Sequence, residues 1–167
     1  MAWLIGFAVI GFMLAPIIWI LPSRRQSQQA AVRAAARAAG LSVKVVAMPK
    51  SRRERVRRED DVFGVCYTRP VHNKKPLPSW KFWLLDIPEG EDDLVPCSPE
   101  VLALIAEFRG LLPNDATMLE FTPIGLHVYW RERQADEAMV ADIALCLNSI
   151  IEKGALETVG EKDFGNE

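Results

Sequence analysis

No charged residue precedes Arg24 in this chain of 167 residues. Ala2 to Leu21 is almost wholly apolar, and twenty residues in a helix extend roughly 30 Å, the thickness of a bilayer core. The lack of Lys or Arg before this long run, and of a small-x-small site directly after it, argues against a cleaved signal peptide. The lack of a polar face argues against a buried helix. The sequence therefore predicts an uncleaved transmembrane anchor over residues 1–22.

Positive charge lies on one side of this anchor only. Four arginines follow the apolar run within a short distance: Arg24, Arg25, Arg33 and Arg37. Because a membrane helix keeps its positively charged flank in the cytoplasm, we expect the N-terminus in the periplasm and the C-terminal part in the cytoplasm.

Small residues recur within the anchor. Ala8, Gly11 and Ala15 share one helical face, and small residues at such spacing allow a second helix to approach closely. This face is the candidate contact with a partner helix.

Cysteine and histidine are scarce. Cys66, Cys97 and Cys146 are isolated, and neither His72 nor His127 stands at metal-ligand spacing from them. These facts disfavour a disulfide framework and a zinc site. The sequence also lacks a glycine-rich phosphate loop and a serine nucleophile motif. We therefore expect no cofactor, no metal and no catalytic residue, and a protein that is not an enzyme.

Alternation along two predicted strands sets the direction of their side chains. His127 points away from the face that Leu126 and Val128 occupy, and a lone strand histidine is typically a packing or surface residue. Trp80 and Trp83 point to opposite faces, so we expect one in the core and the other exposed or at an interface.

The chain after the anchor reads as a basic helix followed by one α+β domain. Ser23 is a typical helix cap, the next residues are rich in helix formers, and Gly40 is a typical stop. We expect the juxtamembrane helix of residues 23–40 to lie along the headgroups or to project as a stalk. The cytosolic domain is predicted over residues 41–154 and an acidic, frayed tail over 155–167.

The predicted domain has the order β-β-β-α-β-β-α. Its strands are expected at 41–48, 62–68, 80–86, 116–121 and 126–133, and its helices at 98–112 and 136–153. Short links between strands favour antiparallel pairing, and both helices can cover one face. The prediction is a two-layer sandwich with a mainly antiparallel five-stranded sheet, able to fold without the preceding helix.

Charge is divided unevenly along the chain. Residues 1–81 contain 15 Lys and Arg against 4 Asp and Glu, whereas residues 82–167 contain 5 against 18. The densest basic run lies between the first two strands and contains Arg52, Arg53, Arg55, Arg57 and Arg58.

Three interpretations of this run are open. It contacts anionic lipid headgroups, or phosphates of RNA or DNA, or it is a solvated loop that pairs with the acidic half of its own domain. The anchor favours lipid, because it holds the loop near a negatively charged leaflet. The acidic overall composition and the lack of a known binding module disfavour nucleic acid.

The stretch from Ile17 to Gln26, Ile-Ile-Trp-Ile-Leu-Pro-Ser-Arg-Arg-Gln, precedes a basic helix rich in Gln and Ala. It resembles the YajC family, the small single-pass accessory subunit of the bacterial preprotein translocase. The likeness covers roughly the first 48 residues and implies an accessory role at the protein-export channel. The whole chain is similar to uncharacterised single-pass inner-membrane proteins of proteobacteria, which implies a bacterial inner membrane. Neither resemblance assigns site residues.

The expected function is that of a non-enzymatic, membrane-anchored adaptor or accessory subunit of an inner-membrane complex, with a protein partner. The alternatives are a role at the export channel and a membrane-tethered enzyme without a recognisable motif. A pocket lined by convergent polar groups would favour the enzyme, whereas an exposed apolar or aromatic sheet face would favour the adaptor.

Overall fold

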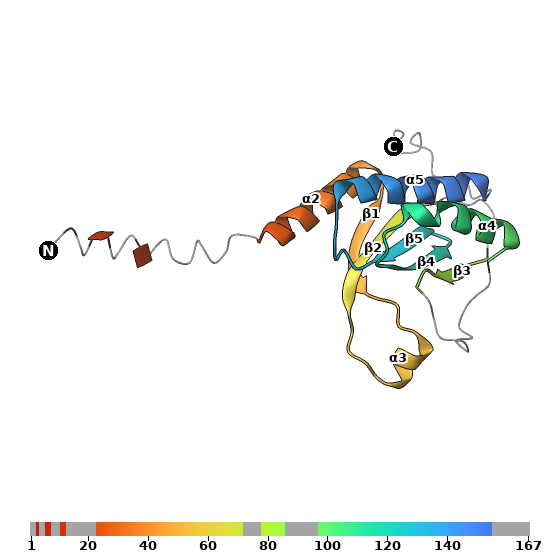
Figure 1. Cartoon of the computed structure of the whole chain (residues 1–167), viewed down its shortest axis with the longest axis horizontal. Helices are drawn as coiled ribbons and strands as arrows, with labels where there is room; N and C mark the ends of the chain where they lie inside the picture. Colours follow the sequence, from red (N-terminus) through yellow and green to blue (C-terminus); the bar gives the residue numbers. More distant parts are fainter. Residues whose placement is uncertain are drawn as a thin grey trace, which may run out of the picture.

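The computed structural model describes residues 3, 6–7, 11–12, 23–71, 78–85 and 97–154. These residues form an α+β fold with a five-stranded antiparallel sheet (Figure 1), as the sequence predicts. Most of the predicted anchor and the whole predicted tail lie outside the described residues. In the part of the chain that is described, no helix is both long and apolar enough to span a bilayer.

The sheet has the strand order β1-β2-β5-β4-β3, and every neighbouring pair is antiparallel. Its strands are β1 (Ser42–Ala47), β2 (Phe63–Pro70), β3 (Trp80–Trp83), β4 (Ala116–Thr122) and β5 (Gly125–Trp130). β4 and β5 form the expected hairpin. β5 ends earlier than predicted because Glu132 takes a positive φ of 51° and leaves the extended conformation.

Within the described residues, three of the four α-helices begin within one residue of the predicted positions, and the short helix between β1 and β2 was not predicted. The helices are α2 (Arg24–Ala38), α3 (Arg52–Val56), α4 (Pro99–Phe108) and α5 (Glu137–Lys153), with a 3₁₀ turn η1 (Arg109–Leu111) after α4. The Ser23 hydroxyl accepts from the Gln26 amide, and the Gln26 side chain accepts from the Ser23 amide, which completes a capping box. Gly40 follows α2 with a φ of 77°, the left-handed conformation that ends many helices.

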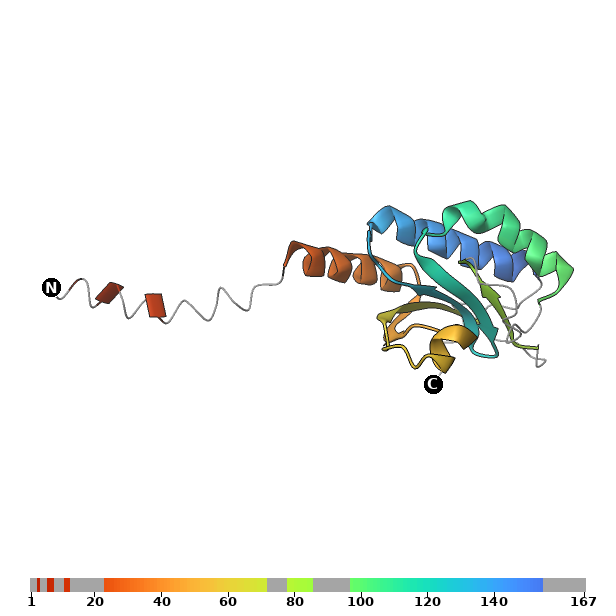
Figure 2. The ribbon, with the colours of Figure 1, turned by 60° about the horizontal axis from the view of Figure 1, so that its bottom comes forward.

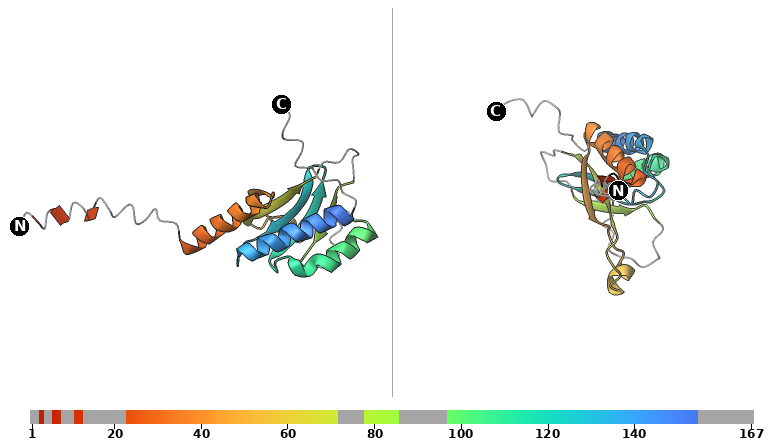
Figure 3. Two further views of the ribbon diagram at one scale, coloured as in Figure 1. Left: turned by 90° about the horizontal axis from the view of Figure 1, so that it is seen from above. Right: turned by 90° about the vertical axis from the view of Figure 1, so that its left-hand side faces the viewer.

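Three helices cover one face of the sheet, whereas the sequence predicts two. α2, α4 and α5 lie together on that face, and the short α3 lies on the other side (Figures 2 and 3). The core fills the space between them. The largest fully buried side chains are Trp130, Tyr67, Phe121, Leu119 and Leu126 from the sheet, with Ile143, Leu147, Ile150 and Ile151 from α5.

α2 belongs to this core and is not a separate stalk. Val32 and Ala36 are both fully buried, and the helix packs against α5 and β1. The prediction of two covering helices is wrong because α2 has a weak apolar signature, in which alanine takes the place of larger side chains.

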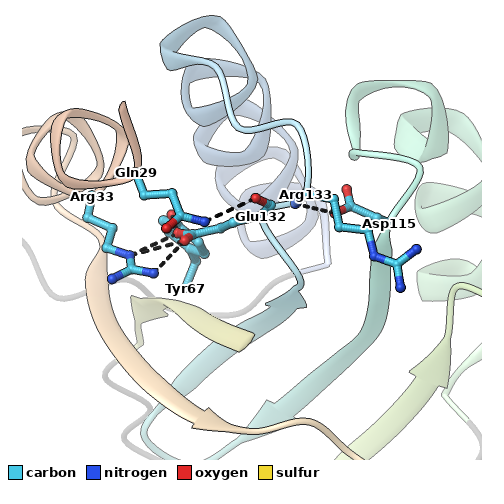
Figure 4. A network of polar contacts seen from close by, with 6 residues as sticks. All are labelled: Gln29, Arg33, Tyr67, Asp115, Glu132 and Arg133. Carbon is cyan, nitrogen blue, oxygen red and sulfur yellow. Dashed lines mark hydrogen bonds and ion pairs between the residues drawn. The ribbon is translucent and has the colours of Figure 1, made fainter. Parts of the chain in front are cut away.

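An ion pair between a partly exposed arginine and a buried carboxylate attaches α2 to the rest of the fold (Figure 4). The Glu132 carboxylate, in a residue only 2% exposed, accepts from Arg33 Nη2 at 2.6 Å and from the Tyr67 hydroxyl at 2.5 Å. Gln29 Nε2 also donates to the Glu132 carbonyl at 3.3 Å. Burial, together with the bond to Glu132, raises the pKa of the Tyr67 phenol, so this hydroxyl remains a donor.

We predict that a fragment of residues 41–154 does not fold cooperatively, whereas a fragment of residues 23–154 does. Removing α2 takes Arg33 from the buried Glu132 carboxylate. Breaking a buried pair costs about 3–5 kcal/mol, against a total stability of about 5–15 kcal/mol for a typical domain. Urea titration followed by circular dichroism measures both fragments.

Arg33→Met in the longer fragment provides the intermediate case. It should keep a single transition and lower the free energy of unfolding. A cooperative transition of equal stability in both fragments would mean that α2 is dispensable to the core.

Candidate functional site

The loop between β1 and β2 is held by its own polar contacts. Ser51 and Glu54 form a second capping box that starts α3, with the Ser51 amide donating to Glu54 Oε2 at 2.7 Å. Lys50 pairs with Asp61 at 2.6 Å and donates to the carbonyl of Glu59. The Lys50 contacts join the two ends of the loop, and the capping box fixes the start of α3.

Two hollows lie between this loop and the sheet. The first has a volume of about 200 Å³ and is lined by Lys50, Arg52, Arg55 and Lys81, with apolar Pro49, Trp83 and Met118. The second has a volume of about 320 Å³ and shares Pro49 and Trp83 with the first. Its other lining residues are Ser51, Arg53, Glu54, Arg57, Glu59, Leu85, Thr117 and Arg131. We call the two hollows together the α3 cleft.

The structure divides the five arginines of the predicted lipid contact. Arg52 and Arg55 line the first hollow, and Arg53 and Arg57 line the second. Arg58 lines neither hollow and has a positive φ of 52° where the loop turns after α3. Contact of these side chains with lipid stays a prediction.

Three residues that bring a cation or an aromatic ring to the α3 cleft from outside the β1–β2 loop were not predicted as site residues: Lys81, Trp83 and Arg131. Lys81 and Trp83 are two positions apart on β3 and therefore share the open face. Trp80 points to the core, where it is 6% exposed and stacks on Phe121. The predicted division of the two tryptophans is thus confirmed, and Trp83 is the one at the candidate site.

A second polar cluster lies on the open face around His127. Its Nδ1 lies 2.7 Å from Thr68 Oγ1, and its Nε2 lies 2.8 Å from Thr122 Oγ1. The residue is 7% exposed. Burial lowers the pKa of the imidazole, and the nearby Glu120 opposes this shift.

The contacts of His127 and Cys66 indicate that these two residues pack the sheet and are not reactive. Cys66 Sγ lies 3.8 Å from His127 Nδ1, but burial raises the pKa of the thiol, which disfavours the reactive thiolate. Both ring nitrogens already have threonine partners. No group of three or more His, Cys, Asp or Glu within the described residues is placed to hold a metal ion.

Only one residue of the predicted helix-partner face can be described. Gly11 is helical, and a Cβ at this position would meet no atom within 4 Å. Ala8 and Ala15 lie outside the described residues. Trp3, Phe7 and Phe12, from the same segment, are 83%, 71% and 85% exposed.

No family model, curated protein or solved structure matches this chain.

We predict that acidification below about pH 6.5 destabilises the domain through His127. The folded pKa lies below the unfolded value of about 6.5, so the unfolded state binds more protons between the two. The free energy of unfolding therefore rises with pH in this window, by at most about 1.4 kcal/mol per pH unit for one proton.

Urea titrations of the fragment of residues 23–154 at pH 5.5 and 7.5 measure this slope. His127→Gln should flatten it. An unaltered slope in this variant would assign the titration to another group.

Proposed function

We propose that this chain is a single-pass protein of the bacterial inner membrane whose α+β domain is a non-enzymatic adaptor, an accessory subunit of a membrane complex. In this proposal residues 1–22 form the anchor, the N-terminus lies in the periplasm and the domain lies in the cytoplasm.

Exposed apolar side chains support the anchor. Trp3, Phe7 and Phe12 each leave more than two thirds of their surface uncovered. Exposed large apolar side chains that gather in one segment indicate contact with lipid or with another protein.

The attachment of α2 is the observation that carries the adaptor proposal. α2 begins directly after the predicted anchor, and its 15 residues span about 22 Å. Residues 23–28 are exposed, whereas Val32, Ala36 and the Arg33–Glu132 pair hold the rest of the helix in the core. In this proposal α2 makes the domain part of the chain that leaves the membrane, so the domain stays beside a partner bound to the anchor.

The α3 cleft supports binding more than catalysis. Its charged lining is mostly guanidinium and ammonium groups. Of its two acids, Glu54 caps α3 and Glu59 lies 4.0 Å from Arg57. Nucleophilic and acid–base catalysis need a nucleophile and a base within hydrogen-bond reach. The Ser51 hydroxyl in the second hollow instead accepts from the Glu54 amide as a helix cap.

The open sheet face is not the broad apolar or aromatic surface expected of an adaptor. It carries polar residues such as Lys44, Thr68 and His127. We therefore propose that the partner contacts the small-residue face of Ala8, Gly11 and Ala15 in the membrane.

Headgroup contact by the arginine run would require the open face of the sheet to turn toward the bilayer, because α3 and α2 lie on opposite sides of the sheet (Figure 1).

We predict that a reporter active only in the periplasm, fused after Gly154, is silent in cells. A fluorescent reporter active only in the cytoplasm, fused at the same position, should be bright. Replacing Arg24 and Arg25 by Gln should raise the periplasmic signal, because fewer positive charges hold this flank inside. Strong periplasmic activity of the unchanged chain would reject the orientation and the adaptor model.

We also predict that the full chain, purified in a mild non-ionic detergent, brings with it one membrane protein in fixed ratio. Gly11→Leu should remove this protein, since the added side chain blocks close helix approach while meeting no atom of its own fold.

Ile10→Leu is the matched control, because it keeps the apolar bulk and adds none at Gly11. It should retain the partner. Co-purification that survives Gly11→Leu would place the contact elsewhere, and the absence of any partner in fixed ratio would contradict the adaptor role.

A further inference from the structure

We infer that the α3 cleft is a binding site for a small phosphate-bearing ligand. The inference goes beyond the adaptor role, because it concerns a ligand of the folded domain and does not depend on the anchor.

Cations reach the cleft from three separate parts of the chain. Arg52 and its neighbours come from the loop that carries α3, Lys81 comes from β3, and Arg131 follows β5. Among the described residues, the first hollow has no acidic lining residue. Like charges gathered at one place repel each other, and an anion bound between them relieves that repulsion.

Part of this charge is not neutralised by the fold. Lys50 pairs with Asp61, and Lys81 pairs with Glu120 at 3.2 Å. In the described part of the chain Arg52 has no ion pair. Its guanidinium is therefore available to a ligand in the first hollow.

A buried donor without an acceptor marks the second hollow. The Nε atom of Arg131 is buried and has no hydrogen-bond partner among the described residues. A buried donor left unsatisfied costs about 1–3 kcal/mol. Arg131 also lines this hollow, so its side chain adds a cation for an anionic ligand bound there.

The chemistry of the lining selects phosphate. Guanidinium groups match the paired oxygens of phosphate with two parallel hydrogen bonds, and several cations suit a multiply charged group. Volumes of about 200 and 320 Å³ are at or below the lower end of ordinary small-molecule sites, roughly 300–1,000 Å³. Trp83, Pro49 and Met118 give the first hollow an apolar floor for a part of the ligand that carries no charge.

The phosphate can belong to a soluble compound or to a lipid headgroup, and both present the same oxygens to the cleft. Isothermal titration calorimetry separates the two sources with the full chain. One arm titrates the chain in non-ionic detergent with inorganic phosphate and pyrophosphate at constant ionic strength. The other titrates it with nanodiscs of phosphatidylcholine, with and without phosphatidic acid.

We expect saturable binding in one arm, weakened at least tenfold by Arg52→Gln and by Arg131→Gln. Arg52 is exposed, so its variant keeps the fold and remains informative if Arg131→Gln unfolds. Arg58→Gln is the matched control: it removes the same charge from the same basic run but lies outside both hollows, and its affinity should stay within twofold.

Binding of soluble phosphate identifies a soluble ligand, and binding only to discs with phosphatidic acid identifies a headgroup. The inference is overturned by the absence of binding in both arms. It is equally overturned if Arg52→Gln and Arg58→Gln weaken binding to the same extent, because diffuse surface charge would then explain the result.

Discussion

The buried carboxylate of Glu132 is the charge on which the arrangement of this fold depends. A carboxylate withdrawn from water is stable only if cations and hydrogen-bond donors surround it. Here Arg33 of α2 and Tyr67 of β2 supply them. This requirement places α2 on the sheet, and the positive φ of Glu132 turns the chain out of β5 toward α5. The helix that leaves the predicted anchor is thereby part of the domain.

Local patterns predicted most of the secondary structure, because caps and side-chain alternation involve residues near one another in sequence. Ser23 and Ser98 each accept from the backbone amide three residues later, and the β4–β5 hairpin joins the two strands expected at 116–121 and 126–133. Ser51 accepts in the same way, but the helix that it caps was not predicted. The place of α2 could not be read in this way. The position of α2 depends on the pair of Arg33 and Glu132, which are 99 positions apart in sequence. It also depends on the burial of Val32 and Ala36, whose small side chains give little periodic signal.

The candidate site shows the same limit. The arginine run around α3 is evident in sequence, but Lys81 and Arg131 are isolated cations in different segments. Only the antiparallel order β5-β4-β3 and the fold of the β1–β2 loop bring them near Trp83. The acidic residues beside these arginines also have a structural role, which a count of charges does not show. Glu54 completes a helix cap, and Asp61 holds Lys50, so they organise the loop as well as offset its charge.

The two outer strands of the sheet have a consequence for association between copies. Unpaired strand edges recruit other strands, and natural proteins restrain this with short edges and lysine side chains. β3 has four residues and carries Lys81, and β1 has six and carries the exposed Lys44 near its centre. Where copies of this domain meet, such edges keep their sheets from joining into one continuous sheet.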